Sequence, residues 1–336
     1  MPAISAPLSD PREARRLAWS RQVLGDATAS LVRASTDAGF RSYWRAGTVG
    51  ETRIVMDSPP ALEDVRPWLR VQALLDAAGV RVPRVLAEAV NEGFLLLEDL
   101  GSETLLQVLD AGNADALFDD ALTQLLRLQS IEVPPWLPAY DEALLLRELE
   151  LFETWFLGRH LGVTLTAVER KALASVHRVL VEAALAQPQV LVHRDFMPRN
   201  LMPVGDGPAV LDFQDAVVGP IAYDPLCLFK DAFLDWPQQR VDGWLDRYHA
   251  RAAAAGLPVP PRARFQHDLD LIGVQRHLKV LGIFARLQHR DGKPKYLRDA
   301  PRFVAYLDAV LPRHGELASL SALLERHVHP TLAKGA

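Results

Sequence analysis

The stretch VLVHRDFMPRNLMPVGDGPAVLDFQDA, residues 190–216, decides the fold because it places polar residues directly after two short apolar runs. The runs VLV and AVL have the composition and length of buried strands. Asp195 follows the first run, Asn200 comes five residues later, and Asp212 follows the second run. We therefore predict two short strands, each leading into a loop that carries oxygen-bearing side chains.

These three side chains match what phosphoryl transfer requires from a protein. A carboxylate must accept the proton of the attacking hydroxyl, and oxygen ligands must hold Mg²⁺ against the phosphates. A rigid loop must keep both within about an ångström of an in-line geometry. We assign Asp195 as the base and Asn200 and Asp212 as the metal ligands, and we expect His193 to orient the loop through backbone hydrogen bonds. A lone Asp or Asn in a loop is more often a turn residue, but several spaced identities coincide here.

The first third of the chain is rich in predicted strands. We predict a helix over residues 10–24 and three short strands within residues 28–57. A second helix is predicted over residues 61–78, followed by strands over 80–89 and 94–98. Asp10 is a good N-cap for the first helix, and Pro11 suits its first position. Residues 47–50 form a compact hairpin connection, and Pro67 marks a break or a restart in the second helix.

From Gly101 onward, apolar residues recur at the three- and four-residue spacing typical of helices. Helices are predicted over residues 102–110, 114–130, 141–158, 164–186, 224–235 and, as the longest, 261–290. A strand-rich first third followed by a helical remainder indicates an α+β protein with two lobes, residues 1–98 and 99–336. We expect a ligand to bind in a cleft between such lobes.

Composition restricts the class of protein. The 336 residues are 49% apolar and 24% charged, which is ordinary for a globular protein and excludes the disordered and fibrous classes. The net charge is −5, whereas a protein that binds nucleic acid usually carries an excess of positive charge. No apolar stretch approaches the ~20 residues of a membrane helix. A single cysteine, Cys227, excludes an internal disulfide. We expect a cytoplasmic monomer with neither nucleic acid nor membrane as a partner.

The motifs HRDFMPRN (193–200) and VLDFQDA (210–216) resemble the protein-kinase-like fold in its aminoglycoside and choline phosphotransferase branch. The resemblance spans residues 25–310 and includes LLLEDLG (95–101), which falls where the interlobe hinge of that family lies. It implies a bilobal α+β fold. The small antiparallel-sheet lobe would lie on the nucleotide side, and the larger helical lobe would carry the catalytic loop. The implied cofactors are ATP and Mg²⁺.

Three further segments are similar to the bacterial N-acetylmuramate/N-acetylglucosamine anomeric kinases: DFQDAVVGPIAYDP (212–225), GVQRHLKVLGIFARL (273–287) and RDGKPKYLRDAPR (290–302). Those enzymes return cell-wall sugars to nucleotide-sugar synthesis. The resemblance implies ATP-dependent phosphorylation of the anomeric hydroxyl of N-acetylmuramate or N-acetylglucosamine to a sugar 1-phosphate. An anomeric hydroxyl is more acidic than an ordinary alcohol, so a modest base suffices.

The nucleotide contacts follow from the same resemblance. The adenine of ATP would hydrogen-bond the backbone of a hinge strand, so we expect Glu98, Asp99 and Leu100 to contribute through main-chain atoms. The turn at 35–40 contains only one glycine, Gly39, which makes it a weak candidate for a loop that holds phosphates.

One departure from the kinase pattern concerns the lysine that usually holds the α- and β-phosphates from the third strand. Met56 stands at the expected position, and no lysine precedes Lys171. Either Mg²⁺ and backbone amides hold the phosphates alone, or an arginine of the sheet replaces the lysine. We predict that Arg41 or Arg45 contacts the nucleotide phosphates.

The sequence gives fewer indications of the residues that bind the acceptor. Gln214 and Asp215 follow Asp212 directly, so they lie near the expected approach of an acceptor and could bind sugar hydroxyls. A muramate also carries a lactyl carboxylate, which calls for a cation with fork geometry. The candidates lie in the catalytic loop and on the late helix: Arg194, Arg199, Arg276 and Arg286. For each of them, a surface or interlobe ion pair is an equally good interpretation. We expect Asp224 to be an N-cap or a loop anchor.

Two other functions remain open. A kinase of the same class could phosphorylate an aminoglycoside, choline or another small alcohol, although the arginine-rich catalytic loop argues against a cationic acceptor. A catalytically weak kinase-like binding protein would explain the missing lysine, but such a protein has no use for a base at Asp195. Release of ADP in the presence of a panel of sugars and amines separates these alternatives.

Overall fold

The computed structural model describes residues 10–35, 40–48, 51–205, 207–231 and 233–335. These residues divide into two compact units. The first comprises the described residues up to Val108 together with Arg199–Gln214, and the second comprises Leu109–Pro198 and the residues from Asp215 onward. This division differs from the boundary expected at residue 98, because the hairpin within Arg199–Gln214 packs on the N-terminal residues.

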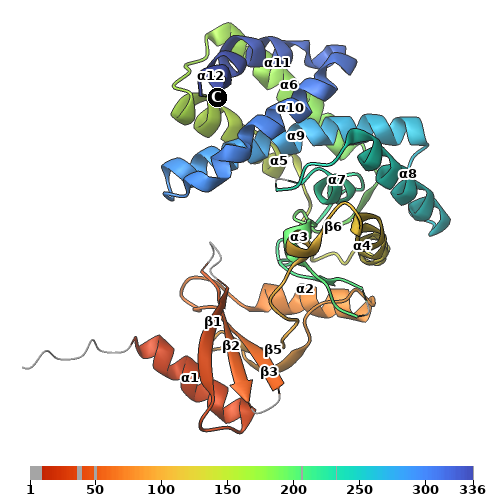
Figure 1. Ribbon diagram of the computed structural model, residues 1–336. Coiled ribbons are helices and arrows are strands. Elements are labelled where there is room, and N and C mark those ends of the chain that lie inside the picture. Colours follow the sequence, from red (N-terminus) through yellow and green to blue (C-terminus); the bar gives the residue numbers. More distant parts are fainter. Residues whose placement is uncertain (1–9, 36–39, 49–50, 206, 232, 336) are drawn as a thin grey trace, which may run out of the picture. The chain divides into compact units, whose positions relative to one another are not determined.

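The first unit is built on an antiparallel sheet with the strand order β1-β2-β3-β5-β4 (Figure 1). Its strands and helices are β1 (Ser30–Ser35), β2 (Ser42–Thr48), β3 (Glu51–Asp57), β4 (Val85–Ala89), β5 (Phe94–Glu98), α1 (Pro11–Leu24), α2 (Arg66–Ala77) and α3 (Leu105–Val108). The predicted sheet, with one helix inserted after the third strand, is confirmed. The predicted hairpin at 47–50 and the turn around Gly39 lie partly outside the described residues.

Helix α1 begins as predicted and is attached to the sheet in two ways. The side chain of Asp10 accepts a hydrogen bond from the backbone N–H of Arg12, as an N-cap does. The apolar face of the helix, with Trp19, packs against a buried cluster formed by the sheet: Ala46, Val55 and Leu96. Arg12 and Arg16 also pair with the buried carboxylate of Asp57 at the end of β3, at 2.6 and 2.8 Å.

Two element boundaries in the first unit differ from the prediction. Helix α2 begins at Arg66 rather than at 61, and Pro67 lies in its first turn, where the missing N–H of proline is tolerated. Strand β4 begins only at Val85, after Pro83. Gly93 sits in the turn between β4 and β5 with φ +71°, and a Cβ there would lie 1.8 Å from the carbonyl oxygen of Ser58.

The second unit is mainly helical, and the long helix α9 contacts α5, α6, α7 and α10 (Figure 1). Its helices are α4 (Ala114–Gln129), α5 (Glu142–Leu151), α6 (Ala167–Leu185), α7 (Tyr223–Phe229), α8 (Gln238–Ala254), α9 (Arg262–His289), α10 (Ala300–Val310), α11 (Ala318–Leu323) and α12 (His329–Gly335). Segments of 3-10 or π helix are η1 (Phe152–His160), η3 (Pro294–Asp299), η4 (Leu311–Arg313), η5 (Gly315–Leu317) and η6 (Leu324–Val328). The helix predicted over 224–235 is shorter, since α7 ends at Phe229.

Both apolar runs of the opening stretch form strands, as predicted. In the second unit β6 (Gln189–Val192) pairs with β9 (Val217–Pro220). In the first unit β7 (Leu201–Met202) pairs with β8 (Ala209–Val210). A 3-10 turn, η2 (Pro198–Asn200), lies between β6 and β7 along the chain. Among the described helices, none combines the length and apolar character that a membrane span requires.

Candidate active site

The loop that carries Asp195 follows β6 and is held by a buried carboxylate. Asp224, in the first turn of α7, accepts hydrogen bonds from the backbone N–H groups of His193 and Arg194, at 2.7 and 3.0 Å. The buried ring of His193 accepts a further bond from the backbone N–H of Asp195, at 3.2 Å. The predictions that Asp224 anchors the loop and that His193 orients it through the backbone are confirmed. Asp195 itself is half-buried.

The carboxyl group of Asp224 has an unusual environment for an acid. Burial raises the pKa of Asp224 to about 7, although the two backbone donors favour its charged form. The carboxylate of Asp195 raises the pKa further, because two like charges nearby oppose each other. The charge next to the candidate base therefore changes near neutral pH.

Arg194 has a strained backbone, and buried side chains hold its guanidinium in place. Its φ is +75°, in the left-handed region that few residues other than glycine adopt. The guanidinium pairs with the carboxylate of Glu148 at 2.5 Å, and the backbone carbonyl of Arg194 accepts a weak bond from Cys227 Sγ at 3.5 Å. Fixed contacts at both ends of Arg194 help to hold the loop in its strained form.

Glu148 is the centre of a buried polar network in the second unit. Lys279 Nζ lies 2.9 Å from Oε1 of Glu148, and Gln275 donates to Oε2 at 3.1 Å. The hydroxyl of Tyr140 also donates to Oε2. Burial alone would raise the pKa of Glu148, but the cations of Lys279 and Arg194 lower it to about 2. Glu148 therefore remains a carboxylate that compensates two cations.

No local pattern in the sequence marks this network. Glu148 and Gln275 are 127 positions apart in the chain, and Glu148 and Arg194 are 46 positions apart. No feature of the sequence shows that Glu148 is buried; once the structure shows its burial, charged partners are expected, because a buried charge is rarely without one.

The candidate metal ligands Asn200 and Asp212 lie together in the first unit. The backbone N–H of Leu211 donates to the carbonyl of Asn200 at 2.8 Å. This bond lies one residue beyond the Leu201–Val210 pair, so it extends the pairing of β7 with β8 up to Asn200. Asp212 has φ +61° and an exposed side chain, whose Oδ1 accepts a bond from Gln214 at 2.9 Å. Phe213 anchors this end by packing on Trp68, with ring centroids 5.0 Å apart. A carboxylate and an amide oxygen at one end of a hairpin fit the hard oxygen ligands that Mg²⁺ takes.

The side chains of the predicted hinge are already occupied by arginines. Arg81 binds Glu98 at 2.6 Å, and this hydrogen bond lowers the pKa of Glu98 to about 2. Arg45 forms a fork with the carboxylate of Asp99, at 2.6 and 3.1 Å, and also donates to the carbonyl of Gly101. The main chain of this segment is partly engaged as well, because the backbone N–H of Glu98 donates to the carbonyl of Arg84 at 2.9 Å.

The arginines predicted to replace the lysine both form ion pairs in the first unit. Arg41 lies 3.0 Å from Glu63, and Arg45 is held by Asp99 as described. Met56 is completely buried in the sheet, so its side chain belongs to the core.

The residues predicted to bind the acceptor occupy different environments. Arg276 is buried in the second unit, with 2% of its surface exposed, and donates to the backbone carbonyl of Lys230 at 3.1 Å. Arg199 is half-buried in the first unit, and Asp215 is exposed in the second. Gln214 contacts Asp212, and Arg194 contacts Glu148.

A cavity of about 440 Å³ lies elsewhere in the second unit, between α8, α9 and the end of α10. Its polar lining includes Lys230, Asp242, Asp270 and His277. None of the residues predicted for the active site lines this cavity.

Comparison with known proteins gives a consistent result. A family model described as "Phosphotransferase enzyme family" matches residues 30–266. An N-acetylmuramate/N-acetylglucosamine kinase of Pseudomonas putida is 52% identical over 308 residues, which cover 91% of this chain and 90% of that protein. An ADP-bound aminoglycoside phosphotransferase superposes with a TM-score of 0.61 at 16% identity, covering 88% of this chain and 97% of that one. A choline kinase from Streptococcus pneumoniae gives 0.63 at 15% identity, covering 88% and 99%.

The solved structures, at such low identity, establish the fold. They confirm the predicted α+β architecture of the kinase-like type, with an antiparallel sheet followed by a mainly helical remainder. The family model covers most of the chain, and the Pseudomonas kinase is similar over nearly its whole length. The chain therefore belongs to the phosphotransferase enzyme family.

Proposed function

We propose that this phosphotransferase transfers the γ-phosphoryl group of ATP to the anomeric hydroxyl of N-acetylmuramate or N-acetylglucosamine and releases ADP and the sugar 1-phosphate. The observation that carries the proposal is the 52% identity, over 91% of the chain, to a kinase named for these two sugars. The ADP bound to a structural neighbour supports ATP as the donor. The product would return cell-wall sugars to nucleotide-sugar synthesis.

In this proposal Asp195 accepts the proton of the anomeric hydroxyl. The hydrogen bonds from His193 and Arg194 to Asp224 keep the loop of Asp195 in one conformation, so that the carboxylate need not reorganise during the reaction. Asn200 and Asp212 would hold Mg²⁺, which when bound neutralises negative charge on the phosphates.

For the nucleotide, we propose main-chain contacts of Glu98, Asp99 and Leu100 with the adenine. Arg41 or Arg45 would contact the phosphates in place of the missing lysine. Either arginine must then share its guanidinium between the phosphates and its present carboxylate partner, Glu63 or Asp99. Arg45 already presents fork geometry, which suits a phosphate as well as a carboxylate.

For the acceptor, we propose that Gln214 and Asp215 bind sugar hydroxyls. A cation would bind the lactyl carboxylate of N-acetylmuramate, and the candidates are Arg194, Arg199, Arg276 and Arg286. Arg276 lies in the interior and Arg194 already compensates Glu148, whereas Arg199 and Arg286 are both half-buried. We choose Arg199 because it lies in the same loop motif as Asp195.

The test is a measurement of ADP release with Mg-ATP and a panel of acceptors. We expect release with N-acetylmuramate and N-acetylglucosamine, and phosphorus NMR should find the new phosphate on the anomeric carbon. The matched control is the reduced sugar N-acetylglucosaminitol, which lacks an anomeric hydroxyl and should give no ADP. Turnover of the reduced sugar, or turnover only with aminoglycosides or choline, would replace the proposal with another acceptor.

We also propose that the enzyme acts in the cytoplasm, where ATP is available, and that it works as a monomer. Light scattering at the enzyme concentration used in the assay measures the oligomeric state directly.

A further inference from the structure

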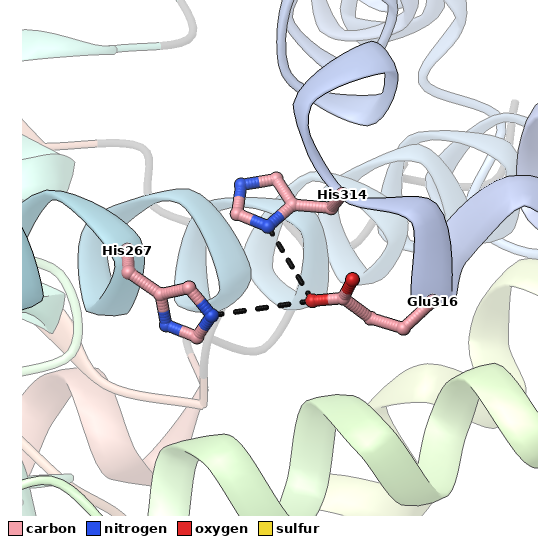
Figure 2. A group of neighbouring side chains, drawn as sticks. All are labelled: His267, His314 and Glu316. Atoms are coloured by element: carbon pink, nitrogen blue, oxygen red, sulfur yellow. Dashed lines mark ion pairs between the residues drawn. The ribbon is translucent and has the colours of Figure 1, made fainter.

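Two histidines and a glutamate of the second unit point toward one another (Figure 2). His267 lies in the second turn of α9, whereas His314 and Glu316 come from the short turns η4 and η5 and their junction. Nε2 of His267 is 4.0 Å from Oε1 of Glu316, and Nδ1 of His314 is 3.5 Å from the same oxygen. All three potential ligand atoms lie within 4.8 Å of one another.

Each imidazole also has a carboxylate behind the nitrogen that faces away from Glu316. Nε2 of His314 is 3.0 Å from Asp270, and Nδ1 of His267 is 3.8 Å from Asp268. The contact of His314 with Asp270 is within hydrogen-bond distance, so it favours the tautomer of His314 with the proton on Nε2 and leaves the lone pair of Nδ1 directed toward Glu316. The contact of His267 with Asp268 is longer than a hydrogen bond, and Nδ1 of His267 is a buried atom without a hydrogen-bond partner among the described residues.

The charges around the cluster leave Glu316 without an arginine among its described contacts. Arg264 pairs with Asp268 at 2.8 Å, and Arg313 pairs with Asp270 at 2.8 Å. Two imidazole nitrogens and one carboxylate oxygen thus converge, and a cation bound between them would compensate the charge of Glu316.

We propose that His267, His314 and Glu316 bind a divalent transition-metal ion of the Zn²⁺ type. Two imidazole nitrogens and one carboxylate oxygen are a common zinc ligand set, whereas Mg²⁺ takes oxygen ligands almost alone. Zinc–ligand bonds of about 2.0–2.1 Å in a tetrahedron place neighbouring ligand atoms about 3.4 Å apart. The observed separations of 3.5 and 4.0 Å from the Glu316 oxygen are close to this value, and the two imidazole nitrogens, which lie within 4.8 Å of each other, would have to move closer together.

The exposure of the ligands suits such a site. The side chains of His267 and Glu316 are each 43% exposed, whereas that of His314 is 7% exposed. Water can therefore occupy the fourth position, and the ion can enter from solvent. The ion would join α9 to the segment between α10 and α11, and this site is separate from the Mg²⁺ site proposed on Asn200 and Asp212.

The experiment is a calorimetric titration of metal-stripped full-length protein with ZnCl₂ in excess Mg²⁺, so that the oxygen site does not compete. We expect one Zn²⁺ per chain and a higher Tm in the presence of Zn²⁺. Glu316→Gln and His267→Gln should each weaken Zn²⁺ binding by more than about 10-fold, since each removes a ligand. His329→Gln is the matched control: it removes a histidine that contacts Asp308 at 3.1 Å near the same end of the chain, and it should leave the affinity unchanged.

Substitution of Co²⁺ for Zn²⁺ gives a second readout that is independent of stability. The wild-type protein should develop visible d–d absorption bands on binding Co²⁺, and His267→Gln should lose or shift them. Absence of stoichiometric binding would overturn the proposal. Unchanged affinity in both ligand variants, or loss of binding in His329→Gln, would overturn it as well.

Discussion

Burial separates the tasks of the two carboxylates near the catalytic loop. Asp224 is completely buried and uses both oxygens to hold the backbone of His193 and Arg194. Asp195 is half-buried and lies in the loop that Asp224 positions. The same functional group thus serves as a buried anchor at one position and is only half-buried at the other.

Replacing the candidate base should affect turnover far more than binding. Asp195→Asn keeps the size of the side chain but removes its ability to accept a proton, so kcat should fall by about 10²–10⁴-fold. The Kd for ATP should be nearly unchanged. Asp76→Asn, at an exposed position on α2, is the control. Full turnover in Asp195→Asn would remove this residue from the role of base.

A substitution at Arg199 should distinguish the two sugars. If its guanidinium binds the lactyl carboxylate, Arg199→Ala should raise the KM for N-acetylmuramate by about 10-fold or more, the loss of a charge-assisted hydrogen bond. N-acetylglucosamine lacks that carboxylate and is the internal control, so its KM should change little. Equal effects on both sugars would argue against this contact.

The buried Glu148 should contribute more to stability than the half-buried Glu153, which forms an ion pair with an exposed arginine. Glu148→Gln leaves Lys279 and Arg194 without a counter-charge, so the free energy of unfolding should fall by about 3–5 kcal/mol. Glu153→Gln breaks the exposed pair with Arg170 at 2.9 Å and should cost less than about 1 kcal/mol. Urea unfolding of both variants measures the difference, and similar losses would mean that the buried network adds nothing.

At the scale of elements, helix α9 approaches the junction of α5 and η1 very closely. A Cβ at Gly282 would lie 2.4 Å from the backbone carbon of Leu151, a separation that real Cβ atoms do not show. The absence of a side chain at this position therefore allows the two helices to pack together.

Two helix-interior glycines should respond to alanine with opposite signs. Gly282→Ala should destabilise the protein by about 2 kcal/mol or more, because backbone atoms must move to admit the methyl group. Gly243→Ala, in α8, meets no atom within 4 Å and should stabilise the protein by about 0.5–1 kcal/mol through helix propensity alone. Thermal unfolding of the two variants tests the pair. A stable Gly282→Ala would show that α9 can shift without loss.

At the scale of the whole molecule, buried histidines should influence unfolding by acid. Burial lowers the pKa of His177 from 6.5 to about 4. Between these values the unfolded chain binds more protons than the folded one, so this contribution to stability is present above pH 6.5 and is lost as the pH falls toward 4. Asp224 acts in the opposite direction, because its pKa is raised to about 7 in the folded protein.

The contribution of His177 can be isolated by comparing two proteins. Between pH 7 and pH 5, the wild type should lose about 2 kcal/mol more stability than His177→Gln, whose side chain does not titrate. Arg178→Gln, at the neighbouring exposed position, is the control. Parallel pH profiles for the wild type and His177→Gln, measured by urea unfolding, would contradict a buried neutral histidine.

Local signals in the sequence predicted much of the fold, and they also indicate the candidate site residues, whose roles stay predictions. Asp10 caps α1 through a bond to a residue two positions away, and the strands beside Asp195 and Asp212 follow from short apolar runs. The predicted strand at 80–89 and helix at 61–78 were too long. The predicted strand began before Pro83, whereas β4 begins at Val85. The predicted helix began at residue 61, whereas α2 begins at Arg66, with Pro67 in its first turn.

The amino-acid sequence by itself determined the strand-and-loop motif, the start of α1 and the family, because these depend on residues that are neighbours in the chain. Only the tertiary structure decided which partners the charged groups meet. Glu148 reaches Lys279, and His267 reaches Glu316, only because α9 packs against α5 and lies beside η5. Periodicity reports which face of a helix is buried, but it contains no information on which distant face that helix meets.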